Sequence, residues 1–74
     1  MSKMPAVGGK DLVHALRSLG FDLERIRGSH YFLQHSDGRS TVVPVHSNET
    51  IGPGLLSRIL RECEITREEL LSVL

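Results

Sequence analysis

The sequence has little of what several protein classes depend on. Its 74 residues include a single cysteine, no tryptophan and only 4% aromatic residues. One cysteine excludes an intrachain disulfide and a cysteine-based zinc site, and we expect Cys63 to be a small, half-buried side chain near a helix end. No apolar run approaches the roughly 20 residues of a transmembrane helix, and no signal-peptide core follows the N-terminus. We therefore expect a cytoplasmic protein without a membrane partner.

Net charge is also lacking. Nine basic and nine acidic side chains cancel, which argues against a strongly electrostatic nucleic-acid binder. The distribution is uneven, because residues 1–61 hold eight of the nine basic side chains and five of the nine acids. A modestly basic body with an acidic C-terminal end can bind a polyanion on one side, with a mild dependence on salt.

The helical segments can be read from the spacing of apolar residues. A chain of this length is expected to form a single domain, residues 1–74. Leucines at helical spacing predict a helix over residues 10–19 that ends at Gly20. The same spacing predicts a second helix over residues 53–63, with a proline in its first turn. Thr66 and Glu69 match a capping box, which predicts a short last helix.

Between the long helices, the sequence predicts three strands over residues 21–27, 30–35 and 39–45. The two helices are the only material available to cover one face of such a sheet. We therefore predict an α+β two-layer sandwich. Its three-stranded antiparallel sheet is covered on one face by two helices in the order α-β-β-β-α, and a short C-terminal helix follows.

Two turns set the register of the predicted sheet. Gly28 and Ser29 make the first bend, and the Asp-Gly pair at residues 37–38 is a strong hairpin signal. A two-residue loop there places His30 opposite Val45. A three-residue loop shifts the pairing by one residue and brings His46 onto the face of His30. The sequence leaves both registers open.

The four histidines do not predict a metal site. His30, His35 and His46 lack the H-x3–5-H spacing of metal ligands on one helix, and no cluster of cysteines or carboxylates completes a set of four. His35 is expected to be solvated beside the hairpin turn. We therefore expect no bound metal.

A single histidine at the glycine bend can still act as a general acid or base. An imidazole titrates near pH 6.5 and can accept a proton at cellular pH, which contributes roughly 10²–10⁴-fold to a rate. RNA carries its own nucleophile, the 2′-hydroxyl, which DNA lacks. His30 is therefore a candidate base for RNA cleavage. The alternative is a histidine at the rim of the sheet, hydrogen-bonded to backbone.

Five short stretches carry a resemblance to a known family. They are residues 16–21 (LRSLGF), 27–31 (RGSHY), 37–39 (DGR), 43–46 (VPVH) and 58–60 (RIL). Taken together they resemble the HicA toxins, small mRNA interferases of bacterial and archaeal toxin–antitoxin pairs. The similarity extends over residues 10–70, which is nearly the whole chain.

The resemblance implies a fold similar to the double-stranded-RNA-binding domain, with His30 of the G-S-H motif as the catalytic residue. It also implies an activity without a metal or other cofactor, an mRNA substrate, and a HicB-type antitoxin that covers the active surface. One departure concerns the second long helix. Where the family often has Gly-Thr-Leu, this chain has GLL at residues 54–56, so we expect the N-cap at Gly52 with Pro53 at N1.

We therefore predict a metal-independent endoribonuclease with His30 as general base, which neither cuts nor binds DNA by itself. Gly28 and Ser29 are expected to shape the approach of the RNA. The candidate phosphate contacts are Lys10, Arg27 and Arg39.

His46 is a candidate auxiliary group, acting as general acid if the register brings it to the face of His30. Otherwise it closes the strand with a backbone hydrogen bond.

Two other function classes compete with this prediction. A non-catalytic double-stranded-RNA-binding module needs a basic stripe at the start of the second long helix, and that helix has no basic residue before Arg58. A pure protein-interaction partner would instead use the apolar strand edge near Val45.

Overall fold

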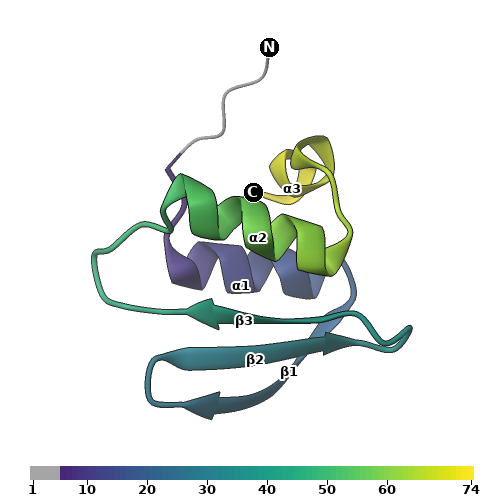
Figure 1. Cartoon of the computed structure of the whole chain (residues 1–74), viewed down its shortest axis with the longest axis horizontal. Coiled ribbons are helices and arrows are strands. Elements are labelled where there is room, and N and C mark those ends of the chain that lie inside the picture. Colours follow the sequence, from purple (N-terminus) through teal and green to yellow (C-terminus); the bar gives the residue numbers. More distant parts are fainter. Residues whose placement is uncertain (1–5) are drawn as a thin grey trace.

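Three helices and three strands follow one another along the chain in the predicted order (Figure 1). The computed structural model describes residues 6–74, so residues 1–5 of the expected domain lie outside the described part. None of the helices within residues 6–74 is long and apolar enough to cross a membrane. The elements are α1 (Gly9–Ser18), β1 (Phe21–Arg27), β2 (His30–His35), β3 (Ser40–Pro44), α2 (Pro53–Cys63) and α3 (Arg67–Val73).

The strands form one antiparallel sheet in the order β1-β2-β3, so β2 lies in the middle. Figure 1 shows α1 and α2 side by side on one face of this sheet, with the short α3 beyond them. The predicted α+β architecture is confirmed. We call the face that no helix covers the open face.

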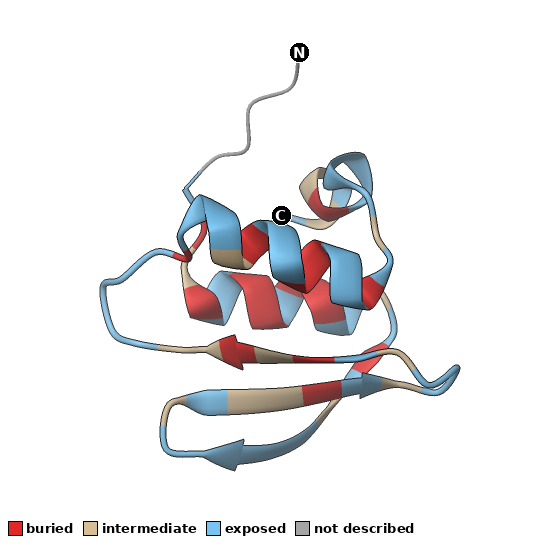
Figure 2. Ribbon diagram, in the orientation of Figure 1, coloured by how far each residue is buried: buried red, intermediate tan, exposed pale blue. Residues whose placement is uncertain are grey.

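The core lies between the helices and the covered face of the sheet (Figure 2). Leu12 and Leu16 of α1, Phe21 and Leu33 of the sheet, and Ile59 of α2 are all at most 1% exposed. Burying one such side chain contributes roughly 1.5–3 kcal/mol. Cys63 was expected to be half-buried, but it is fully buried at the end of α2.

The helix ends follow local chemistry as predicted. Gly20 follows the C-cap of α1 with a positive φ of 100°. Gly52 is the N-cap of α2, and Pro53 is the first residue of that helix. The capping box of α3 is complete. The backbone N–H of Glu69 donates to the Thr66 hydroxyl at 3.0 Å, and the Thr66 N–H donates to the Glu69 carboxylate at 2.9 Å.

The β2–β3 hairpin adopts the three-residue loop. His35 N–H donates to the Arg39 carbonyl at 2.7 Å, so residues 36–38 form the loop and His30 pairs with Pro44. Only Gly38 has a positive φ there, at 102°. This fits a type I turn followed by a left-handed glycine rather than a type I′ turn, in which both central residues need positive φ.

Pro44 ends β3 at a position where its missing N–H removes no bond to β2. The His35 N–H to Arg39 bond and the Val45 N–H to Ser29 carbonyl bond, at 2.7 Å, mark the hydrogen-bonded pairs of this ladder. Such pairs alternate with non-hydrogen-bonded ones, and the pair of Pro44 with His30 is of the second kind. β3 is also an edge strand, where proline is tolerated. The strand is shorter than the predicted 39–45.

A β-bulge in β1 explains the uneven spacing of its apolar residues. Leu23 pairs with Leu33 but Arg25 pairs with Phe32, so Glu24 is an extra residue between them. A bulge shifts every later side chain to the other face. Together with the alternation of β2 and β3, it sets the residues of the open face, which are Asp22, Arg25, Arg27, His30, Phe32, Gln34, Ser40, Val42 and Pro44.

Candidate active site

His30 is the first residue of the central strand, and it is exposed on the open face. Its partner on β1 is Arg27 and its partner on β3 is Pro44. The pair of His30 with Pro44 is not hydrogen-bonded, and in such pairs the two Cα atoms are only about 4.5 Å apart. The His30 side chain therefore lies on the open face between its strand partners Arg27 and Pro44, and it is exposed to solvent.

A tight hairpin holds the backbone of this histidine. Gly28 has a positive φ of 59°, whereas the φ of Ser29 is not positive. This combination fits a type II′ turn with glycine at its first central position. The Ser29 carbonyl accepts the Val45 N–H at 2.7 Å, so the turn is tied to the chain after β3. A Cβ at Gly28 would meet nothing within 4 Å. Glycine is needed there for its conformation, and it leaves open space beside His30.

The bulge decides which basic residues share this surface. Without an extra residue at Glu24, regular alternation from Phe21 and Leu23 would aim Arg25 and Arg27 at the helices. With the bulge, both arginines lie on the open face, Arg27 opposite His30 and Arg25 opposite Phe32. Of the three predicted phosphate contacts, the structure brings only Arg27 next to His30.

Lys10 and His46 line a different hollow. Both border a depression of about 700 Å³ that also includes Tyr31 and Asn48. Tyr31 packs against the core, so its side chain faces away from that of His30. The three-residue loop has the register that would align His46 with His30, but β3 ends at Pro44 before reaching it. His46 lies in the following loop, where its Nδ1 is 4.0 Å from a carboxylate oxygen of Glu49.

Arg39 lies beyond the opposite end of β2 from His30. Its Nη1 donates to the Cys63 carbonyl at 2.6 Å, its Nε donates to the Asp37 carboxylate at 2.9 Å, and its guanidinium lies 5.1 Å from the centre of the Phe21 ring. The hydrogen bonds from Arg39 lower the pKa of Asp37 below its usual value. These contacts join the second hairpin to the end of α2, and they do not bring Arg39 to His30.

His35 was expected to be solvated, and that prediction is wrong. The ring is 22% exposed and meets the ring of Phe21 edge-on, with 5.2 Å between the centroids. Its Nδ1 accepts the backbone N–H of Asp37 at 3.2 Å. Within residues 6–74, no three histidine, cysteine, aspartate or glutamate side chains are grouped so that they could hold a metal ion.

Two open-face residues were missed in the sequence. Both Tyr31 and Phe32 are aromatic residues of β2, but only Tyr31 packs on the core. The carbon of the Arg25 guanidinium lies over the Phe32 ring, 4.4 Å from its centre. Strict alternation along β2 is the signal that could have placed Phe32 on the face of His30. The position of Arg25 could not be found in this way, because it depends on the bulge.

Comparison with known proteins identifies the family. The family model described as the HicA toxin of bacterial toxin–antitoxin systems matches residues 9–65, which contain α1, the whole sheet and α2. No curated protein matches the chain. The matched region covers most of the 74 residues and contains His30 on its hairpin. The chain belongs to the HicA toxin family, and it is the toxin of a toxin–antitoxin pair.

Proposed function

We propose that this toxin is a metal-independent endoribonuclease that cleaves mRNA, with His30 as the general base. The observation that carries the proposal is the placement of His30. It is the exposed histidine of the open face, held by a type II′ hairpin with Arg27 as its strand partner. A base on a rigid element with a cation beside it suits a reaction that moves one proton and develops charge on a phosphate.

In the proposed reaction, the imidazole of His30 takes the proton of a ribose 2′-hydroxyl. The 2′-oxygen forms a bond to the adjacent phosphorus, and the bond from phosphorus to the 5′-oxygen breaks. That oxygen leaves with a proton from water, which the exposed site admits. The products are a 2′,3′-cyclic phosphate end and a free 5′-hydroxyl. DNA has no 2′-hydroxyl and is not a substrate.

The neighbouring residues have simple roles in this scheme. Arg27 contacts the phosphate, because charge-assisted hydrogen bonds from a guanidinium are strong and can be bidentate. Gly28 leaves the approach beside His30 open, and Ser29 helps to hold the turn through its carbonyl. We assign no step to Lys10, Arg39 or His46, since the structure places them in other parts of the molecule.

Membership of the family implies an antitoxin partner. We propose a HicB-type protein that inhibits by covering the open face around His30. An antitoxin bound to the open face would keep RNA away from His30 without any change in the toxin's fold.

The test compares His30→Ala with His14→Ala, which removes an exposed histidine from α1. His30→Ala is expected to lose RNA cleavage and growth arrest while its circular dichroism spectrum stays that of the wild type. His14→Ala is expected to keep both activities. EDTA should leave cleavage unchanged, and a DNA oligonucleotide of the same sequence should stay intact. Retained cleavage in folded His30→Ala would falsify the assignment.

A further inference from the structure

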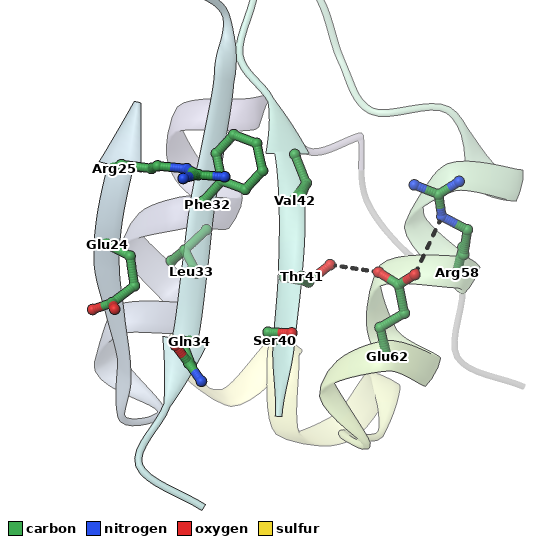
Figure 3. A pocket seen from close by; sticks show the side chains of 10 residues that line it. All are labelled: Glu24, Arg25, Phe32, Leu33, Gln34, Ser40, Thr41, Val42, Arg58 and Glu62. Atoms are coloured by element: carbon green, nitrogen blue, oxygen red, sulfur yellow. Dashed lines mark hydrogen bonds and ion pairs between the residues drawn. The ribbon is translucent and has the colours of Figure 1, made fainter. Parts of the chain in front are cut away.

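The open face carries a stacked pair that the fold does not require. Phe32 is half-buried and lies outside the core cluster, and the exposed Arg25 covers one side of its ring at 4.4 Å (Figure 3). Val42 is the strand partner of Phe32 on the other side. An aromatic ring, a guanidinium plane and a branched apolar side chain thus form one row across all three strands.

We propose that this pair is a nucleobase-binding site, on which a base of single-stranded RNA stacks while the chain is cut at His30. The inference rests on the proposed function and names the form of its substrate. Single-stranded bases are bound by stacking on aromatic rings and on arginine planes, with little sequence preference because every base has a π-face. The Arg25–Phe32 pair presents both kinds of surface already assembled.

The spacing of the open face suits a chain of nucleotides. His30 and Phe32 are two residues apart on one strand, so they point to the same face about 6.6 Å from each other. Arg27 stands opposite His30 and Arg25 opposite Phe32, so a cation accompanies each of them. A nucleic-acid strand, with its regular repeat of bases and phosphates, can contact the His30–Arg27 pair and the Phe32–Arg25 pair at once.

A hollow beside Phe32 has room for the base. It has a volume of about 510 Å³, within the range of small-ligand sites. At its far end Gln34 and Ser40 offer hydrogen-bonding groups for the edge of a base, as Figure 3 shows.

Charge separates the places for base and phosphate. Glu24 and Glu62 offset Arg25 and Arg58 in the lining of the hollow, so it carries no net positive charge to hold a phosphate, while Arg27 adds a positive charge at the His30 end. Glu62 is held in place, because its carboxylate accepts the Thr41 hydroxyl at 2.8 Å and lies 3.7 Å from Nε of Arg58. The uncharged part of the nucleotide is therefore expected over the hollow. A duplex is disfavoured, because its bases are already stacked and paired inside the helix.

The experiment measures binding of a fluorescein-labelled, single-stranded 2′-O-methyl oligoribonucleotide to the full chain by anisotropy. This probe cannot be cut, because its 2′-oxygen carries no proton. Phe32→Ala and Phe32→Leu are expected to weaken binding roughly 5- to 150-fold, and Phe32→Tyr to preserve it. Phe32→Leu keeps most of the bulk of the side chain but removes the aromatic ring. It therefore tests stacking even if Phe32→Ala does not fold.

Matched controls separate stacking from general effects. Ile26→Ala removes a side chain that is 50% exposed but belongs to the helix-side face of β1, and it should bind as the wild type does. Arg17→Ala makes the same charge change as Arg25→Ala from α1, and it should weaken binding less. Because the chain has no tryptophan, the Phe32→Trp variant carries a single indole. Its emission should be quenched by the single-stranded probe and not by a duplex.

The outcomes distinguish this inference from the proposed function. Phe32 variants that bind the probe as tightly as the wild type overturn the inference, whatever the cleavage assay shows. If the Phe32 variants keep their RNA affinity but no longer bind the antitoxin, the inference is also overturned. The Arg25–Phe32 pair would then be a protein-docking surface. Phe32-dependent binding by a wild-type toxin that cuts no RNA supports the inference and sinks the nuclease proposal.

Discussion

His30 and Arg27 are strand partners across the first hairpin, and both side chains point to the face of the sheet that the helices leave uncovered. Two local features produce this relationship. The type II′ turn at Gly28 makes the two residues direct partners, and the bulge at Glu24 turns Arg27 to the open face without disturbing the buried Phe21. The candidate active site therefore depends on one extra residue in an otherwise regular strand.

Removal of the Arg27 guanidinium should slow RNA cleavage without unfolding the toxin. A charge-assisted hydrogen bond to phosphate contributes roughly 1.5–3 kcal/mol, so Arg27→Ala is expected to lower kcat/KM about 10- to 100-fold. Its dependence on salt should also be shallower by about one unit of log–log slope. Steady-state cleavage at several salt concentrations measures both. Equal losses in Arg17→Ala, which carries the same charge change on α1, would mean that only net charge matters.

Substitution of Gly28 should destabilise the fold through its backbone alone. An alanine at φ 59° costs about 1–2 kcal/mol of unfolding free energy, although the added Cβ meets nothing within 4 Å. Gly54→Ala is the matched control, because that site is equally open and its φ is not positive. It should be neutral or stabilising by up to about 1 kcal/mol. Urea unfolding of the two variants measures the difference, and equal stabilities would contradict the turn assignment.

Arg39 is expected to support stability rather than RNA binding. Arg39→Ala loses the 2.6 Å hydrogen bond to the Cys63 carbonyl and the cation over Phe21. We expect a loss of roughly 1–3 kcal/mol in unfolding free energy, measured by urea titration. Arg61→Ala, an exposed cation on α2, should change stability little. If folded Arg39→Ala toxin keeps wild-type stability but loses cleavage, Arg39 contacts RNA after all.

The buried thiol of Cys63 should make stability fall at high pH. Burial, with the Glu62 carboxylate acting in the same direction, raises the pKa of Cys63 to about 11. An unfolded thiol ionises near 8.5, so the folded state binds the proton more tightly. Its contribution is therefore fully present below about pH 8.5 and is lost as the pH rises toward 11.

The measurement is urea unfolding of the wild type and of Cys63→Ala between pH 7 and pH 10.5. The stability difference between the two proteins should shrink above pH 8.5. At pH 8 the wild-type thiol should also react with an aromatic disulfide reagent far more slowly than free cysteine does. A constant difference, or fast modification of the folded toxin, would show that the thiol is accessible.

Much of the fold was predictable because its signals are local. The glycine after α1, the Thr66 capping box and the bend at Gly28 each depend on a few neighbouring residues, and the structure confirms all three. The length of the second hairpin loop was not predictable. Asp37 and Gly38 suit two loop lengths, and pairing between whole strands chose the longer one.

The candidate site was predictable only around the first hairpin, where His30 and its strand partner Arg27 were both named from the sequence. The G-S-H motif identified His30, but the other predicted residues were chosen by their closeness in sequence or by charge. Arg39 lies at the β2–β3 hairpin loop, where its guanidinium donates to the Cys63 carbonyl, and His46 lies beyond the last residue of β3. Phe32 was not among the predicted site residues, because its place on the open face follows only from the alternation of β2.

The amino-acid sequence alone determined the order of the elements and the position of a histidine at a glycine turn, since helical periodicity and backbone dihedral preferences are properties of short segments. Only the tertiary structure decided which side chains share a face with that histidine. Strand register and the bulge in β1 arise from hydrogen bonds between separate segments, and one residue of shift exchanges the two faces of a strand. The surface of Arg27, His30, Arg25 and Phe32 therefore exists only once the sheet has formed.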